Sequence, residues 1–231
     1  EGCDKFCKFC VVPYTRGPEY SRSIKEIILE ARQLVKNGSR EIILLGQNVN
    51  AYKYKDSQFS DLLYKLNDIE GLERIRFTTS HPKDYTKDLI EAHKKCEKLM
   101  PLLHLPVQSG SSEILKKMNR GHCVKEYTDL IEALKESNSS IKFSSDFIIA
   151  YPGETDKDFE KTIELLKKIK FINTFSFIFS PRPGTPAASL DTVDFRIAKN
   201  RLTLFQQTSN EIKKNYREKL VNTYCNVLFE N

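Results

Sequence analysis

The 231-residue sequence lacks two features that direct a protein to a membrane or out of the cell. No apolar run approaches the length needed to cross a bilayer, and no basic, apolar and small-residue succession marks a signal peptide. These absences predict a cytoplasmic protein that contacts no membrane. Because thiols stay reduced in that compartment, a cluster of cysteines there indicates metal binding or catalysis before disulfides.

Cysteine is scarce, and half of it lies in one loop. Of six cysteines, Cys96, Cys123 and Cys225 are isolated, whereas Cys3, Cys7 and one more at position 10 fall within eight positions. The sequence begins with Glu1 and not Met, so we expect an excerpt of a longer protein cut at both ends. A net charge of +6, from 37 Lys and Arg against 31 Asp and Glu, favours a polyanionic partner without requiring one.

The order of apolar and amphipathic segments predicts an α/β fold. A capping box at Ser23 and Glu26 opens a helix that ends at Asn37 and Gly38, and the unbroken apolar run "REIILLG" follows as a buried strand. The alternation continues with helices near 60–69, from about 85, between 111 and 137, and after a second box at 155–158, and with strands near 74–79, 102–107, 141–151 and 174–180. With a strand expected just before Gly2, this makes about six βα units.

Periodicity alone does not distinguish an open barrel from a doubly wound sheet, since both bury parallel strands beneath helices. In either fold, ligands gather at the carboxyl ends of the strands. The unusual polar segments occupy those ends: the cysteine loop, "GQNVN", "SHP", "QSGSS", "YPGET" and "SPRPGTP". We therefore expect these segments to converge on one face.

The spacing C-x3-C-x2-C of Cys3, Cys7 and Cys10 narrows the choice of metal centre. Structural zinc takes four protein ligands, and the nearest further cysteine lies beyond residue 90. Ferredoxin-type sites ligate every iron with a fourth cysteine, which is also missing nearby. A 4Fe-4S cluster with one iron open to another molecule fits the count best.

This loop, with Phe9 just before the last cysteine, resembles the cluster motif of radical S-adenosylmethionine enzymes. The resemblance implies an open (partial) TIM-type barrel, with Cys3, Cys7 and Cys10 as metal ligands of a 4Fe-4S cluster whose fourth iron is chelated by S-adenosyl-L-methionine. In that family the reduced cluster cleaves this cosubstrate and releases a 5′-deoxyadenosyl radical. A site for such a radical must exclude water and hold one hydrogen close.

Further segments resemble the methylthiotransferase branch of the family: "LGQNVNAY", "LHLPVQSGS" with "MNRG", "SSDFIIAYPGET" and "SPRPGTPA". "VVPYTRG" and residues 47–52 are similar to the group that modifies isopentenylated adenosine in tRNA. The resemblance implies an enzyme that adds a methylthio group to carbon 2 of N(6)-isopentenyl adenosine beside the anticodon. Its partners would be tRNA and an electron donor such as a flavodoxin-type protein, and we expect a monomer.

The same resemblance divides the chain. Residues 1–190 are expected to form the radical SAM core with its first strand cut off, 191–221 a helix that completes or flanks it, and 222–231 the start of a truncated RNA-binding β-domain. An N-terminal domain that holds a second 4Fe-4S cluster is expected outside this chain. Two alternatives remain: a methylthiotransferase acting on threonylcarbamoyl adenosine in tRNA or on a ribosomal-protein aspartate, and a non-catalytic iron-sulfur RNA-binding module.

The resemblance also implies roles for single residues at the strand ends. Candidates for cofactor binding are Phe9, Gly46, Gln47, Asn48, Gln108, Ser109, Ser145, Asp146 and Ile148. Ordinary structural roles compete: a core aromatic, a strand-to-helix turn, or helix capping. Four loop arginines are candidates for binding RNA phosphates or stacking on a base, against a reading as solvated surface charge: Arg16, Arg22, Arg120 and Arg182.

Some positions depart from the family pattern. Lys8 stands where a small hydroxyl residue is usual, and Ala150 and Tyr151 stand where Gly and Phe are commoner. The methyl group of Ala150 is expected to be tolerated with a negative φ. His81 and His104 follow apolar strand segments, and for both a satisfied core histidine is favoured over a ligand.

Overall fold

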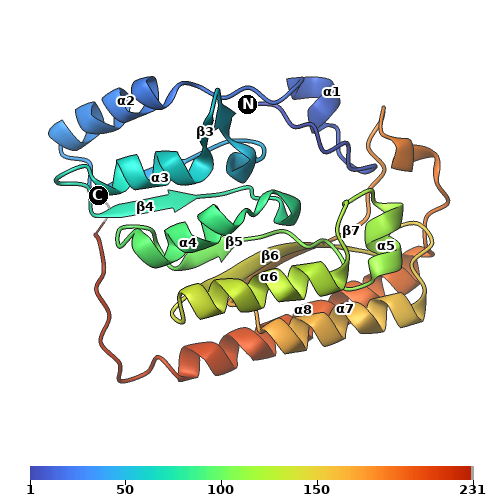
Figure 1. Cartoon of the computed structure of the whole chain (residues 1–231). Coiled ribbons are helices and arrows are strands. Elements are labelled where there is room, and N and C mark those ends of the chain that lie inside the picture. The colour runs from blue at the N-terminus through green and yellow to red at the C-terminus, as the bar shows by residue number, and fades with distance from the viewer. Residues whose placement is uncertain (230–231) are drawn as a thin grey trace.

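The computed structural model describes residues 1–229, in which helices and parallel strands alternate (Figure 1). The strands are β1 (Glu41–Leu44), β2 (Lys53–Tyr54), β3 (Ser57–Gln58), β4 (Arg74–Phe77), β5 (Leu102–His104), β6 (Lys142–Ile149) and β7 (Asn173–Ile178). The α-helices are α1 (Val12–Arg16), α2 (Ile24–Lys36), α3 (Phe59–Asn67), α4 (Lys87–Lys95), α5 (Ser112–Lys117), α6 (Val124–Ser137), α7 (Asp156–Ile169) and α8 (Phe195–Glu218). Short 3-10 turns are η1 (Val49–Ala51), η2 (Pro82–Asp84) and η3 (Pro186–Ser189).

The main sheet is parallel and open, which confirms the predicted α/β partial barrel, while β2 and β3 form a separate antiparallel pair. One part pairs β1 with β4, and the other has the order β5-β6-β7. A single bridge between Ile75 and Leu99 joins them: the Ile75 N–H donates to Lys98 O at 2.8 Å, and the Met100 N–H donates to Ile75 O at 3.0 Å. The strand predicted before Gly2 is not seen among residues 1–229 and stays a prediction.

Local sequence signals set most helix starts. Both predicted capping boxes form, with Ser23 accepting from the Glu26 N–H and Thr155 accepting from the Asp158 N–H. The helices place their apolar faces against one side of the sheet in a core that includes Leu63, Leu66, Ile75, Leu103, Phe147 and Phe205. Alternate residues of each strand point away from the helices. The face of the sheet opposite the helices therefore lines a concave surface.

The predicted long helix after the βα units is α8, which packs against α7 and β7. Residues 223–229, expected to begin a β-strand, form no strand here, and Glu230 and Asn231 lie outside the described residues. The tail instead passes the start of β4, where the Arg74 guanidinium donates to Asn226 O at 3.4 Å. Its assignment to a further β-domain stays a prediction.

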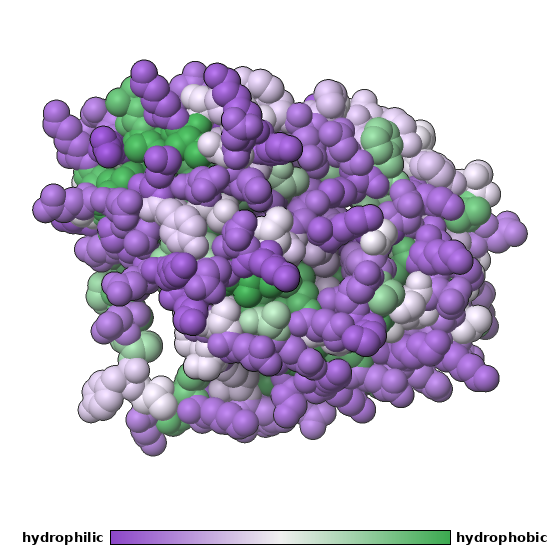
Figure 2. Space-filling view, in the orientation of Figure 1, coloured by the Kyte–Doolittle hydropathy of each residue, from purple (hydrophilic) through white to green (hydrophobic). Residues whose placement is uncertain are grey.

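An apolar groove runs along the outer edge of β1, which has no strand partner on that side among residues 1–229. Exposed Leu34, Ile43 and Leu45 help to line its volume of about 520 Å³. Figure 2 shows a hydrophobic patch over the adjoining α2, at the upper left. None of the described helices combines the length and the apolar composition that a bilayer-spanning segment requires.

Candidate functional site

The cysteine loop lies at the carboxyl ends of the strands and is held there by its backbone. The Lys8 N–H donates to Met118 O at 3.0 Å, and Lys8 O accepts from the Ala187 N–H at 2.9 Å. The Asn119 amide donates to Phe6 O at 3.0 Å. Three regions far apart in sequence, the loop, the end of α5 and η3, therefore meet on the right of Figure 1.

The start of the loop is fixed against the segment after α1. Two hydrogen bonds join Glu1 and Tyr20 across this turn, and the Cys3 N–H donates to Gly17 O at 3.2 Å. Gly2 has a φ of 74°, and a Cβ atom placed on it would lie 1.9 Å from Pro18 O. Position 2 therefore requires glycine, both for its backbone angle and for space.

A charged network supports the loop from the ends of β1 and β4. Lys5 Nζ contacts Asp84 Oδ1 at 2.5 Å, and Asp84 also accepts from the Asn48 amide at 2.7 Å. The same amide donates to Glu19 at 3.1 Å. Asn48 Oδ1 is buried and has no partner within the described residues, so it remains free to accept one hydrogen bond from a ligand.

The three thiols are free, and only one is deeply buried. Cys7 is 6% exposed, whereas Cys3 and Cys10 are half-buried. Burial raises the pKa of both half-buried thiols, with backbone hydrogen bonds opposing the shift. Without a nearby metal these thiols are therefore mainly protonated at neutral pH.

Arg120 lies behind Cys7 in an interior position. It is 6% exposed, and its Nη2 donates to Pro106 O at 2.7 Å while its Nη1 lies 3.4 Å from Cys7 Sγ. Two histidine rings are close by, since those of His81 and His122 meet edge to face with centroids 5.8 Å apart. Burial, assisted by the charge of Arg120, lowers the pKa of His81 to about 2 and that of His122 to about 4, so both rings are neutral.

A second hydrophobic cluster lies beneath the loop. It consists of Ile114, Met118, Tyr151, Phe179 and Ala187, and both Phe9 and Ile148 pack against it. Two residues predicted to bind cofactor are thereby brought to one patch beside the cysteines. Each of these two side chains is half-buried, so one side packs against the cluster and the other side is exposed.

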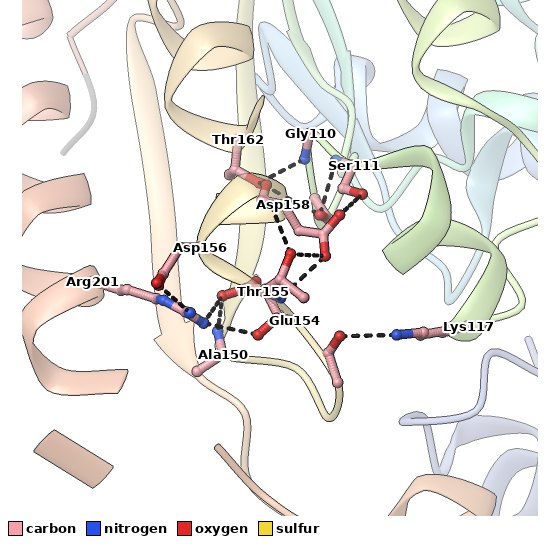
Figure 3. A network of polar contacts seen from close by, with 12 residues as sticks. Gly110, Ser111, Lys117, Ala150, Glu154, Thr155, Asp156, Asp158, Thr162 and Arg201 are labelled. Carbon is pink, nitrogen blue, oxygen red and sulfur yellow. Dashed lines mark hydrogen bonds and ion pairs between the residues drawn. The ribbon is translucent and has the colours of Figure 1, made fainter. Parts of the chain in front are cut away.

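The loop after β5 is tied to α7 by hydrogen bonds (Figure 3). The Gly110 N–H donates to Thr162 Oγ1 at 2.9 Å, and Ser111 Oγ donates to Asp158 at 2.6 Å. Gly110 approaches α7 so closely that a Cβ atom on it would lie 2.4 Å from Lys161 O. The "QSGSS" segment is thus locked onto the start of α7.

On the other side of the same network, Arg201 of α8 grips the loop after β6. Its guanidinium lies 2.9 Å from Glu154 Oε1 and 2.7 Å from Asp156 Oδ1 (Figure 3). Glu154 Oε1 also accepts from the Ala150 N–H at 3.0 Å. Burial raises the pKa of Glu154 to about 7, although Arg201 opposes the shift. Neither Glu154 nor Arg201 was among the residues predicted from the sequence, and the acidic residue in "YPGET" was the available signal.

The structure separates the remaining candidates by the direction of their side chains. Ser145 is fully buried and accepts from the Val107 N–H at 3.0 Å, and Ser109, 1% exposed, accepts from the Ser111 N–H at 3.1 Å. The helix cap is Ser111 and not Ser109. Asp146 instead lies on the concave face with His104, whose Nε2 is 3.3 Å from Asp146 Oδ1.

Backbone positions at the strand ends also differ from expectation. Ala150 has a φ of 60°, so the condition of a negative φ, under which its methyl group is expected to be tolerated, is not met; at this angle the Ala150 N–H donates to Glu154. Gln108 is also left-handed, with a φ of 78°, while its N–H and carbonyl pair with β6. Gly46 and Gln47 line the groove beside β1.

The four candidate arginines do not share one surface environment. Arg16, Arg22 and Arg182 are exposed, and Arg22 forms an ion pair with Glu30 at 2.7 Å. Arg120 is the exception because its guanidinium is turned inward, toward Cys7.

Comparison with known proteins decides the family. Residues 1–166 match the family model described as "Radical SAM superfamily". The chain belongs to the radical SAM superfamily. Proteins named tRNA-2-methylthio-N(6)-dimethylallyladenosine synthase are similar to this radical SAM chain. That of Pelagibacter ubique is 60% identical, with 100% of this chain and 53% of the relative aligned. That of Rickettsia canadensis is 52% identical with the same coverage.

The relative from Anaplasma marginale is 56% identical over 81% of this chain and 42% of its own length. The chain thus spans about half the length of the curated relatives it matches. Among solved structures, Escherichia coli coproporphyrinogen III oxidase aligns with 91% of this chain and 50% of its own, with a TM-score of 0.63 and 15% identity. Methylornithine synthase aligns with 90% and 60%, with a TM-score of 0.57 and 14% identity. These two likenesses show the radical SAM fold alone.

Radical SAM membership implies a 4Fe-4S cluster and S-adenosylmethionine, and the residues present fit a cluster. Three free thiols share one anchored loop, and a buried guanidinium faces one of them. No group of three His, Cys, Asp or Glu side chains within residues 1–229 converges on a single-ion site. In a cubane each thiolate binds a different iron, so the sulfurs need not meet at one point.

Proposed function

We propose that this chain is the catalytic core of a tRNA methylthiotransferase that modifies carbon 2 of N(6)-isopentenyl adenosine next to the anticodon. The observation that carries the proposal is the anchored C-x3-C-x2-C loop at the carboxyl ends of the strands. The shared name of relatives 52–60% identical over the whole chain supports this substrate over threonylcarbamoyl adenosine or a ribosomal aspartate. The placement of Asn48, Phe9 and Ile148 beside the thiols supports a catalytic core over a binding module.

In this proposal Cys3, Cys7 and Cys10 hold the cluster. When bound, the cluster supplies one electron to S-adenosylmethionine, whose cleavage gives the 5′-deoxyadenosyl radical. The free Asn48 Oδ1 accepts a hydrogen bond from the cosubstrate, and Phe9 and Ile148 cover its flat apolar part. Gly46 and Gln47 give it backbone contacts, and Gln108 contributes its side-chain amide because its backbone N–H and carbonyl pair with β6. Ser109 and Ser145 shape the wall from within, because their hydroxyls are already hydrogen-bonded.

The concave face holds the target adenosine in this proposal. Asp146 orients His104, and the half-exposed Phe175 meets the His104 ring with centroids 6.0 Å apart. Aromatic and imidazole faces of this kind stack on splayed-out bases of RNA loops. Exposed Arg16, Arg22 and Arg182 are proposed contacts for tRNA phosphates.

Several parts of the proposal concern the whole protein. They are a second 4Fe-4S cluster on a preceding domain, an RNA-binding β-domain after residue 222, a flavodoxin-type electron donor, a cytoplasmic location and a monomeric state. The resemblance supports each of them, and the chain spans about half the length of its relatives.

The test begins with anaerobic reconstitution of the chain with iron, sulfide, reductant and S-adenosylmethionine. We expect 5′-deoxyadenosine from the wild type and none from Cys3→Ala, Cys7→Ala or Cys10→Ala. The matched control is Cys225→Ala, which removes an exposed thiol outside the loop and should change neither iron content nor product. Equal iron binding by the three loop variants and the wild type would refute the assignment.

The substrate is tested separately. Nucleosides of tRNA from cells that lack the full-length protein are identified and quantified by mass spectrometry. We expect isopentenyl adenosine to accumulate without its methylthio group, and the full-length gene to restore the mark. An unchanged methylthio signal on isopentenyl adenosine would reject the substrate while leaving the cluster assignment intact.

A further inference from the structure

Arg120 is a buried cation without a carboxylate partner. Its side chain donates to Pro106 O and, at 3.4 Å, to Cys7 Sγ, and its Nε is buried with no hydrogen-bond partner among residues 1–229. No Asp or Glu of residues 1–229 lies within ion-pair distance of it, unlike the equally buried Arg201. An uncompensated buried charge costs several kcal/mol, so folded proteins rarely keep one without an anion nearby.

Within residues 1–229, no group in contact with Arg120 supplies an anion other than sulfur. His81 and His122 are neutral, and the charges of Lys5 and Lys83 add to the positive field at His81. Tyr127 and Ser145 face the same interior as uncharged hydroxyls. Two groups near the guanidinium become negative when they bind metal: Cys7, whose Sγ is 3.4 Å from Nη1, and Cys10, which also feels the charge of Arg120.

We infer that Arg120 is the counter-charge of the cluster held by Cys7 and raises its reduction potential. The inference rests on the proposed function, since it presumes a cluster on the three thiols. Reduction adds one electron and no proton, so the negative charge beside the guanidinium grows by one unit. A fixed positive charge and an N–H donor at a ligand sulfur therefore stabilise the reduced state more than the oxidised state.

Arg120 contacts a ligand and no substrate, so it acts through Cys7 as a positioning residue. Its guanidinium also spans two elements, because Pro106 follows β5 while Cys7 belongs to the N-terminal loop. Two donor groups on one rigid plane fix the sulfur relative to the sheet. Lysine at this position would keep the charge but not the two-point contact.

The experiment compares the wild-type chain with Arg120→Gln, Arg120→Lys and a control, Arg32→Gln, which removes an exposed charge on α2. Each protein is reconstituted anaerobically without S-adenosylmethionine, its iron is counted, and the reduced fraction is measured by electron paramagnetic resonance at a series of fixed potentials. At one potential we expect the ratio of reduced to oxidised cluster to fall about tenfold in Arg120→Gln, which is about 59 mV for one electron. The lysine variant should stay within about threefold of the wild type, and the control should not change.

The outcomes separate the two proposals. A wild type without a cluster rejects the proposed function itself. A clustered wild type with an unchanged ratio in Arg120→Gln overturns this inference alone, and a weakened spectral response to added S-adenosylmethionine would then assign Arg120 to the cosubstrate. If Arg120→Gln binds no iron, Arg120→Lys decides: normal loading and ratio support the counter-charge, and a tenfold fall or loss of iron in it overturns the inference.

Discussion

The ion pair between Arg201 and Glu154 should decide how firmly α8 is attached to the loop after β6. In the variant Arg201→Met the carboxylate of Glu154, 1% exposed, loses its cation, while the flexible apolar side chain keeps much of the packing over Phe159. Breaking one side of a buried pair typically costs about 3–5 kcal/mol. We expect about 3 kcal/mol in the free energy of unfolding, because Glu154 can take up a proton and still accept from the Ala150 N–H.

The cost should also depend on pH. In the wild type the pKa of Glu154 is raised to about 7, so this carboxyl ionises above pH 7. Without Arg201 its pKa rises further, while in the unfolded chain it is near its ordinary value of about 4.3. The folded variant then holds a proton that the unfolded chain and, above pH 7, the folded wild type have released, so its stability relative to the wild type falls by up to about 1.4 kcal/mol for each pH unit above 7. Relative to the wild type, the variant should lose about 1 kcal/mol more at pH 8 than at pH 7, because Glu154 of the wild type is only half ionised at pH 7.

Urea unfolding at pH 6, 7 and 8 measures these differences. Lys199→Met is the matched control because it removes an exposed charge from the same helix. The double variant with Glu154→Gln should lose less than the sum of the single variants, by about 1–3 kcal/mol. The reasoning is refuted if Arg201→Met unfolds like the control, or if its cost is the same at pH 6 and pH 8.

Two further predictions concern other buried positions. Gly110→Ala should lower the free energy of unfolding by about 1–3 kcal/mol, since its Cβ would meet the backbone of α7 at Lys161 and Thr162. If this variant unfolded at the same urea concentration as the wild type, the close contact would be contradicted. Burial lowers the pKa of His93 to about 4, as for His122, and that of His81 to about 2. Because the unfolded rings bind protons below about pH 6.5 and the folded ones do not, each should cost about 1.4 kcal/mol of stability at pH 5.5. His93→Gln should lose about 1.4 kcal/mol less than the wild type between pH 7.5 and pH 5.5 in urea unfolding, and equal changes in variant and wild type would refute the assignment.

Features fixed by neighbouring residues were predictable from the sequence. The boxes at Ser23 and Thr155 set the starts of α2 and α7 because side chain and backbone partner lie three residues apart. The parallel strands were predictable because strands buried under helices consist of unbroken apolar runs. The three cysteines were identified as candidates because their spacing is itself a local property.

Features that depend on distant partners were not predictable in this way. Arg120 lies between Asn119 and Gly121 and looks like a surface arginine, but its burial comes from Cys7, 113 positions away. Arg201 looked like one charge among many on a long helix, and its partner Glu154 is 47 positions earlier. The left-handed backbone of Ala150 follows from the hydrogen bond to Glu154 and has no signature in residue type.

The bridge at Ile75 has a consequence for the width of the concave face. Bending the sheet there would break two backbone hydrogen bonds and leave both sets of paired strands in register. At a net worth of about 0.5–1.5 kcal/mol each, those bonds resist a hinge motion by only about 1–3 kcal/mol. The width of the concave face is therefore governed by the helices behind the seam, where α4 packs against both α3 and α6.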